Sequence, residues 1–285
     1  MTPPTVWPPS RRPASSVWPC WWPSLSASPA CRPPRRVVAA SHRAAIAACP
    51  NPICSSRCCR WPILSLSPAS ADPAAFIRLH TAPAPVPLCP DIHLWQATEI
   101  TPIWHATEDW LQRNGVPPPF WAFPWAGGQA VARLILDDPP LVAGKRVMDF
   151  AAGSGLIAIA AMKAGAASVT AVEIDPFAIT ATGLNADLNG VSITGLTQDI
   201  IGQPLSGIDI LLAGDVCYER SFAEAALAWF RELARSGITV LVGDPGRAYL
   251  PSQGLEKVAT FNVPTTLELE DRAVRVTDVW RVPAP

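Results

Sequence analysis

The sequence predicts an α/β fold in which a doubly wound, mostly parallel sheet of seven strands ends in an antiparallel hairpin. Between residues 146 and 243, short apolar segments of strand length alternate with helical segments, and this alternation is typical of a parallel sheet. From Val258 to Val282 the pattern alternates without a long helix, which favours a hairpin. A ligand is expected at the carboxyl ends of the parallel strands, near the switch in strand order.

The parallel strands are predicted from short apolar segments, which are Arg146–Phe150, Ser168–Val172, Ile193–Thr197, Ile208–Ala213 and Ile238–Gly243. An alanine-rich helix is expected over Leu156–Lys163, stopped by Gly165. Asp175 and Pro176 begin the next helix, which ends at Gly190. The third helix runs to Arg235, and the pattern Ser221-Phe222-Ala223-Glu224 is interpreted as its capping box.

Residues 76–140 are predicted to form a helical lead-in to a domain that spans 76–285. Pro102–Asn114 is expected to be a short helix, and an apolar helix is expected to follow Gly127-Gly128 and reach about Leu136. Four prolines between residues 83 and 90 indicate a linker of polyproline II type.

Residues 1–75 are predicted to be a disordered or spurious extension rich in Pro, Arg, Trp and Cys. Residues 1–71 contain eight Arg, no acidic residue and fourteen of the 33 Pro. A basic, acid-free start is similar to an organellar transit peptide, but the prolines interrupt the amphipathic helix of such peptides. A start site placed too far upstream is the other interpretation. The cysteines here lack the paired spacing of zinc sites, so no metal is expected.

Charge and composition narrow the classes of partner. Residues 1–71 carry +8 and the whole chain −1, so residues 72–285 carry −9. An acidic body argues against nucleic acid and favours a basic protein or peptide. The sequence contains no run of 18 apolar residues, so no membrane span is predicted. Only Cys217 follows Cys89, which favours a reducing compartment: the cytoplasm, or the mitochondrial matrix if the leader is a transit peptide.

Acidic residues and glycines follow the first three predicted strands. Asp149 ends the first strand, and Gly153 and Gly155 would let the backbone approach a ligand closely. Glu173 ends the second strand, where a carboxylate can accept hydrogen bonds from both hydroxyls of a ribose. Asp199 follows the third strand and could meet an adenine amino group. These residues should lie on one rim of the sheet.

Two nucleotide cofactors and a purely structural turn compete for this pattern. The segment from Gly153 to Ala158 also fits G-x-G-x-x-A, and Glu173 lies 20 residues from Gly153, as in dinucleotide sites. However, Asp149 would repel a pyrophosphate and attract the ammonium of a methionine moiety. The chain also ends in a hairpin rather than in a second strand-helix-strand half. The sequence therefore favours S-adenosylmethionine over NAD.

The fourth strand ends in Asp215-Val216-Cys217-Tyr218, at the rim where an acceptor would enter. Asp215 can accept N–H bonds from an amine while Tyr218 packs along it. Alternatively, Asp215 caps the following loop and Tyr218 covers the core. Cys217 is expected to be a core residue. All four His precede the predicted strands and helices of the sheet, so none is near to activate the thiol. Trp125 is expected at an edge of the cofactor cleft.

Four segments carry a resemblance to a known family: PPPFWAFPWAGGQAVARLILDDP, VMDFAAGSGLIAIAA, VEIDP and GDVCYE. They resemble the electron transfer flavoprotein beta-subunit lysine methyltransferases, and more widely the ribosomal protein L11 methyltransferases. The resemblance covers about 76–285 and implies a Rossmann-like class I methyltransferase fold. It departs from the family pattern at Ala151, where many members have a glycine. The expected cofactor contacts are Trp125, Asp149, Phe150, Gly153, Gly155, Glu173, Ile174 and Asp199.

The resemblance also implies the reaction. Asp215 and Tyr218 match the D-x-x-Y signature of lysine methyltransferases and are the expected catalytic residues, with Asp215 positioning the amine rather than acting as a base. The implied substrate is the beta subunit of electron transfer flavoprotein. Ribosomal protein L11 and a small-molecule amine or hydroxyl are alternative acceptors. An inactive cofactor-binding scaffold is the alternative from another class.

Overall fold

The computed structural model describes residues 72–98, 103 and 118–284, and all of them belong to one compact unit. The predicted extension over 1–71 and most of the predicted helix Pro102–Asn114 lie outside the described residues. Helix α1 (Pro73–His80) begins at Pro73, within the range assigned to the extension, and Asp72 caps it by accepting from Ala74 N at 3.1 Å. Within the described part of the chain, every helix is too short or too polar to cross a bilayer.

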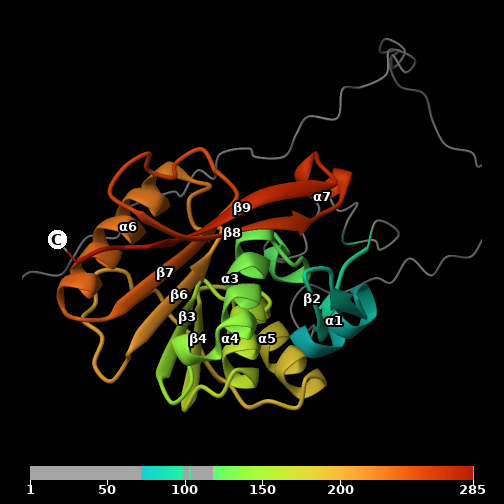
Figure 1. Ribbon diagram of the computed structural model, residues 1–285. Helices are drawn as coiled ribbons and strands as arrows, with labels where there is room; N and C mark the ends of the chain where they lie inside the picture. Colours follow the sequence, from blue (N-terminus) through green and yellow to red (C-terminus); the bar gives the residue numbers. More distant parts are fainter. Residues whose placement is uncertain (1–71, 99–102, 104–117, 285) are drawn as a thin grey trace, which may run out of the picture. The chain divides into compact units, whose positions relative to one another are not determined.

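The seven-stranded, mostly parallel sheet is confirmed (Figure 1). Its order is β5-β4-β3-β6-β7-β9-β8, with β9 antiparallel to both β7 and β8. The last strand of the chain therefore lies inside the sheet and β8 forms the edge. The strands are β3 (Arg146–Phe150), β4 (Ser168–Glu173), β5 (Thr194–Thr197), β6 (Ile210–Gly214), β7 (Thr239–Asp244), β8 (Glu256–Pro264) and β9 (Val274–Arg281).

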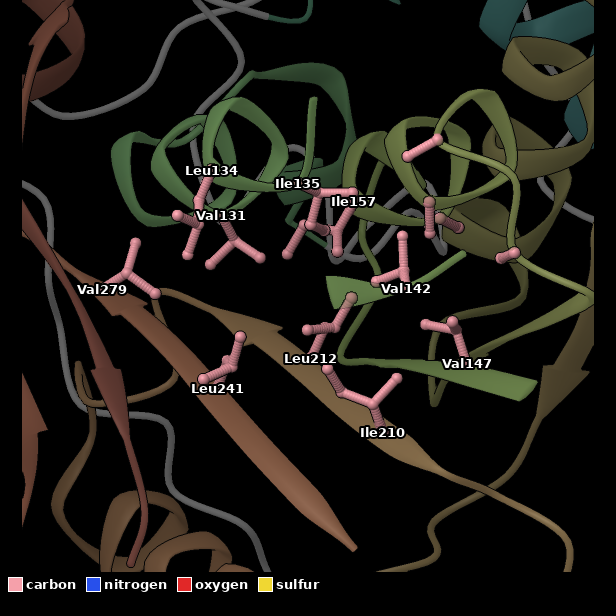
Figure 2. Packing of buried hydrophobic residues seen from close by; sticks show 14 of the residues in the cluster. Val131, Leu134, Ile135, Val142, Val147, Ile157, Ile210, Leu212, Leu241 and Val279 are labelled. Atoms are coloured by element: carbon pink, nitrogen blue, oxygen red, sulfur yellow. The ribbon is translucent and has the colours of Figure 1, made fainter. Parts of the chain in front are cut away.

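Helices cover both faces of the sheet, as the doubly wound class requires. They are α3 (Ala126–Asp137), α4 (Leu156–Lys163), α5 (Pro176–Leu188) and α6 (Arg220–Arg235). A short helix α7 (Leu267–Glu270) lies between β8 and β9 in the chain, and 3-10 turns occur at Phe120–Ala122 and Pro139–Leu141. On one face, Val131 and Ile135 of α3 lie above Leu212 of β6 and Leu241 of β7 (Figure 2). On the other face, residues of α6 such as Phe230 pack on the alternate strand positions.

The predicted polyproline linker is wrong, because that segment forms a hairpin of β1 (Ala82–Val86) and β2 (Cys89–Gln96). Strand β1 pairs only with β2, so one of its edges needs no N–H donors, and proline is tolerated on such edge strands. The prolines at 83, 85, 87 and 90 are all exposed. The lead-in is thus a helix, a hairpin and α3 rather than a wholly helical segment.

The predicted capping box at Ser221 is also wrong. Helix α6 begins at Arg220, and its cap is Glu219, which lies two residues before Ser221 and accepts from Ser221 N at 3.0 Å and Phe222 N at 2.7 Å. A carboxylate with two acceptor oxygens satisfies two of the unpaired N–H groups of the first turn, whereas a serine hydroxyl satisfies one. Ser221 instead donates its hydroxyl to Glu219 at 2.8 Å, and Glu224 pairs with Arg220.

Three glycines let the first turn of α3 lie directly on the ends of β6 and β7. A Cβ on Gly127 would lie 2.7 Å from Asp215 N and would also collide with the carbonyl of Gly243. A Cβ on Gly214 would lie 2.6 Å from Gly128 N. Backbone therefore packs on backbone here, and no other residue type leaves the space.

This packing predicts opposite effects for two adjacent glycines. Gly127→Ala should lower the free energy of unfolding by about 3 kcal/mol or more, because the neighbouring atoms are backbone and cannot move aside. Gly128→Ala should be neutral or stabilising by up to about 1 kcal/mol, since alanine favours helix and the nearest atom is a flexible Leu156 methyl at 3.9 Å. Urea unfolding of both variants tests this, and equal stabilities would contradict the packing argument.

Candidate active site

A cleft opens at the carboxyl ends of β3 and β6, the point where the strand order switches. Strand β3 is flanked by β4 on one side and by β6 on the other. The connections after β3 and β6 therefore run in opposite directions along the sheet, and this leaves a crevice at the ends of these two strands. This is the position that the sequence predicted for a ligand. The cleft is lined by Phe123, Trp125, Gly128, Asp149, Ala151, Ala152, Gly153, Ser154, Leu156, Ile157, Gly214 and Asp215.

The floor of the cleft is the glycine turn after β3. Gly153 and Gly155 have φ of +52° and +76°, in the left-handed region that favours glycine. At Gly155 a Cβ would also lie 2.7 Å from Thr182 Cγ2 of α5. Ala151 has φ of +53°, so the position where the family pattern has glycine does take a glycine conformation, at a cost of about 1 kcal/mol for alanine.

Asp149 carries the strongest electrostatic signature of the cleft. Its side chain is 0% exposed, Oδ2 accepts from Ala158 N at 2.9 Å, and Oδ1 has no hydrogen-bond partner. Burial raises the pKa of this carboxyl well above its ordinary value, and the nearby charge of Glu173 raises it further, whereas the bond from Ala158 lowers it. An unpaired buried carboxylate that borders a cleft is suited to a cationic ligand group.

Glu173 lies at the end of β4 and Asp199 two residues beyond β5, so the structure brings the predicted acidic residues to the carboxyl ends of adjacent strands. Glu173 accepts from Gly153 N at 3.2 Å and from Ile174 N at 2.7 Å, which ties it to the glycine turn. Asp199 is exposed and accepts from Ile201 N at 3.1 Å. Ile174 is 61% exposed beside Glu173. Their contacts with a cofactor stay predictions.

The side chain of Phe150 is not among those that line the cleft, and its expected contact with the cofactor stays a prediction. Side chains alternate along β3, so Asp149 borders the cleft while Phe150 turns to the opposite face of the sheet. There its ring packs against three aromatic residues of α6, with centroid distances of 5.2 to 6.2 Å: Phe222, Trp229 and Phe230. The pattern DF at a strand end could not distinguish these two faces.

Trp125 lies at the edge of the cleft, where the sequence placed it, as the residue that precedes α3. Its indole N–H donates to the carbonyl of Phe120 at 2.8 Å, and its ring contacts Phe120 and Phe123. The guanidinium of Arg247 lies 5.7 Å from the ring centroid on a third side. These contacts hold the indole in one orientation.

Asp215 borders the cleft, but both its carboxylate oxygens are engaged. Oδ2 accepts from Gly127 N at 2.5 Å and Gly128 N at 3.2 Å, in the first turn of α3. Oδ1 accepts from Arg247 Nη2 at 2.7 Å and Nε at 3.1 Å. The residue itself has a φ of +55°. The sequence left open that Asp215 caps the loop after it. In the structure Asp215 caps the first turn of α3 instead.

Arg247 is the residue that sequence reasoning missed. It is 12% exposed and bridges Asp215 to Glu270, the last residue of α7, with Nη2 to Oε1 at 2.6 Å. Arg275 of β9 lies 3.3 Å from the same glutamate. The signal that could have revealed it is Asp244-Pro245-Gly246-Arg247, a turn that follows β7 on the same rim. Asp244 holds this turn by accepting from Gly246 N and Arg247 N.

Tyr218 is 39% exposed and lies on the loop between β6 and α6, beside the residues that line the cleft. Its ring contacts those of Phe120 and Phe222. Partial burial raises the pKa of its hydroxyl above 10, and the charges of Glu173 and Glu219 raise it further, so the phenol stays protonated at neutral pH. It can donate a hydrogen bond but cannot serve as a base.

Cys217 lies in the core, as predicted. It is 0% exposed, and burial raises the pKa of its thiol, so the nucleophilic thiolate is not populated at neutral pH. Burial likewise raises the pKa of the neighbouring Asp244 to about 6. Among the described residues, no group of three His, Cys, Asp or Glu side chains is placed to hold a metal ion.

Comparison with known proteins connects this site to methyl transfer. Residues 134–213 match the family model described as ribosomal protein L11 methyltransferase. The electron transfer flavoprotein beta subunit lysine methyltransferase of Xenopus laevis is 34% identical over 73% of this chain and 86% of its own length. The human protein of the same name is 32% identical over 68% and 75%. Among solved structures, magnesium protoporphyrin IX methyltransferase from Synechocystis PCC 6803 is 21% identical, with a TM-score of 0.42 over 55% of this chain and 79% of that one.

The bridge through Arg247 predicts a large stability effect. Arg247→Met should lower the free energy of unfolding by about 3–5 kcal/mol, because it leaves Asp215 buried without a countercharge and leaves Glu270 with Arg275 alone. Arg146→Met removes a bond of the same length, to Asp209, between side chains that are 53% and 37% exposed, and should cost about 1 kcal/mol or less. Thermal unfolding of both variants compares them directly. Equal losses would show that the Asp215–Arg247–Glu270 bridge does not stabilise the fold.

Proposed function

The chain belongs to the electron transfer flavoprotein beta subunit lysine methyltransferase family, and we propose that it methylates lysine side chains of that beta subunit. It is an S-adenosylmethionine-dependent methyltransferase. The observation that carries the assignment of the cleft is the buried, unpaired Oδ1 of Asp149 beside a turn of left-handed glycines. The shared name of the relatives supports the choice of substrate.

The cleft residues fit the cofactor by charge and by space. The Asp149 carboxylate would receive the ammonium of the methionine moiety, and the glycine turn leaves room for close approach of the backbone. Glu173 would accept from the ribose hydroxyls, exposed Ile174 would cover one face of the adenine, and Asp199 would meet its amino group. When bound, S-adenosylmethionine supplies a methyl group activated by a positively charged sulfur.

The chain's own residues would act mainly by placement. A lysine amine must be neutral to attack, yet its ordinary pKa is about 10.4. Tyr218 is protonated and Asp215 is saturated by Arg247 and α3, so we assign neither as the base, and the proton passes to water. Asp215 instead fixes α3 and Trp125 around the place of reaction. Alignment of two reactants is worth up to roughly 7–11 kcal/mol.

Ribosomal protein L11 is the second candidate acceptor, because the chain also matches the L11 methyltransferase model. The family-model match ends at residue 213, two residues before Asp215. It therefore covers the cofactor turn and the strands around it, but none of the loop that carries Tyr218. This supports a cofactor site shared with the L11 methyltransferases. The choice of acceptor is supported by the longer matches with the lysine methyltransferases. The net charge of −9 in residues 72–285 supports a basic protein surface rather than nucleic acid as the partner.

We also propose that the protein works in a reducing compartment, the cytoplasm or else the mitochondrial matrix. Cys89 and Cys217 are both buried free thiols, which supports a setting in which disulfides do not form. Fractionation of the native cells with an antibody against the domain would test this proposal.

The substrate assignment predicts where a labelled methyl group goes. Purified protein and labelled S-adenosylmethionine are incubated in parallel with the beta subunit of electron transfer flavoprotein, with ribosomal protein L11 and with a metabolite extract of the host. We expect label in the beta subunit only, and mass spectrometry should place it on lysine. Label in L11 or in a metabolite alone would contradict the substrate. Cofactor binding without any transfer would instead support the scaffold alternative.

Asp149→Asn is predicted to separate cofactor binding from stability. Affinity for S-adenosylmethionine, measured by calorimetry, should fall about 10- to 100-fold, because a charge-assisted bond to the ammonium is lost. Stability should rise instead. The pKa of Asp149 is higher in the folded state than its ordinary value of 3.8 in the unfolded state. Ionisation therefore destabilises the fold as the pH rises above 3.8, and Asn avoids this loss because it does not ionise.

The matched control for this variant is Asp137→Asn, at a side chain that is 55% exposed and does not line the cleft. It should leave both quantities nearly unchanged. A loss of stability in Asp149→Asn together with unchanged cofactor affinity would show that Asp149 is a structural residue.

A further inference from the structure

Two exposed aromatic rings meet beside the cleft. Phe120 is 48% exposed and Tyr218 is 39% exposed, and their ring centroids are 6.2 Å apart at an interplanar angle of 48°. They come from different segments of the chain: Phe120 precedes α3, and Tyr218 follows β6. We call this pair the aromatic corner. At this separation no chain can pass between the rings, but an alkyl chain can lie along both faces.

The backbone holds Phe120 in its exposed position. Its carbonyl accepts from the indole of Trp125, a cleft residue, at 2.8 Å, and its N–H donates to Pro118 O at 2.8 Å. Pro119 precedes it and restricts the chain further. Burial of a phenyl ring stabilises a fold, and this turn forgoes part of that stabilisation by leaving the ring about half exposed.

Two carboxylates act on the Tyr218 side of the aromatic corner. The charges of Glu173 and Glu219 both raise the pKa of the Tyr218 hydroxyl. Each accepts hydrogen bonds only from backbone N–H groups or a serine hydroxyl, and in the described part of the chain neither has a basic partner within 4.0 Å. The basic side chains nearby are already paired: Arg247 with Asp215, and Arg220 with Glu224.

We propose that the aromatic corner binds the side chain of the acceptor lysine, with Phe120 as a specificity-determining residue that selects a cationic alkyl amine. The methylene chain lies along the two rings, and the ammonium meets the ring faces and the carboxylate of Glu219 before it enters the cleft. An ammonium within about 6 Å of an aromatic centroid is attracted by the ring face. The proposal rests on the proposed function for its substrate, but the recognition of an alkylammonium can be tested separately.

The kinetic test compares three substitutions at Phe120, with the beta subunit of electron transfer flavoprotein as substrate. Phe120→Leu keeps an apolar side chain and removes the ring, so KM should rise about 3- to 30-fold while kcat and cofactor affinity stay within about twofold. Phe120→Ala should show at least the same rise, and Phe120→Tyr should restore the wild-type KM. Leu79→Ala, at another exposed apolar residue (56%), is the control and should change nothing.

The binding test needs no methyl transfer. Protein loaded with S-adenosylhomocysteine is titrated with n-butylammonium or with uncharged n-butanol, and binding is followed by NMR chemical shifts. Wild type should bind the cation more tightly than the alcohol, and Phe120→Leu should lose that preference. An unchanged KM in Phe120→Leu, or cation binding equal in both proteins, would overturn the proposal. If wild type binds the cation through Phe120 yet methylates no lysine, the proposed function fails while the inference stands.

Discussion

The close approach of α3 to the ends of β6 and β7 is the constraint on which the site depends. Gly127, Gly214 and Gly243 remove the side chains that would hold these backbones apart. The carboxylate of Asp215 then accepts from the exposed N–H groups of the first helical turn, at the positive end of the helix dipole. Trp125, the residue before that turn, is thereby held at the edge of the cleft.

Two buried aspartates show how surroundings separate roles within one cleft. Asp149 keeps one oxygen without a partner and forms no ion pair with any described residue, so its burial cost is offset only when a cationic group arrives. Asp215 has its countercharge already, because Arg247 contacts it through two nitrogens and is itself held by Glu270. The first is suited to bind a ligand, and the second to hold the wall of the cleft.

In the proposed function, the cleft has a cofactor half and an acceptor half, which different parts of the chain build. The cofactor half would come from the glycine turn and the ends of β3, β4 and β5, a region that the match with the L11 methyltransferase model covers. The acceptor half comes from the turn before α3, the loop after β6 and the turn after β7. Helix α7 and β9 reach this half through Glu270 and Arg275, so the C-terminal hairpin supports the side where lysine would enter.

The sequence by itself determined that a mostly parallel sheet forms and in what order strands and helices alternate along the chain. It also determined the rim on which Asp149 and Glu173 lie, because all of these follow from local periodicity and turn chemistry. It misjudged the proline-rich hairpin, because pairing with a partner strand decides that structure. It also misjudged the cap of α6, because the helix begins earlier than the capping pattern indicates. Only the tertiary structure could show that Phe150 turns away from the cleft and that Asp215 is paired with Arg247. Those facts depend on which side chains meet across 30 or more residues, and no local pattern encodes that pairing.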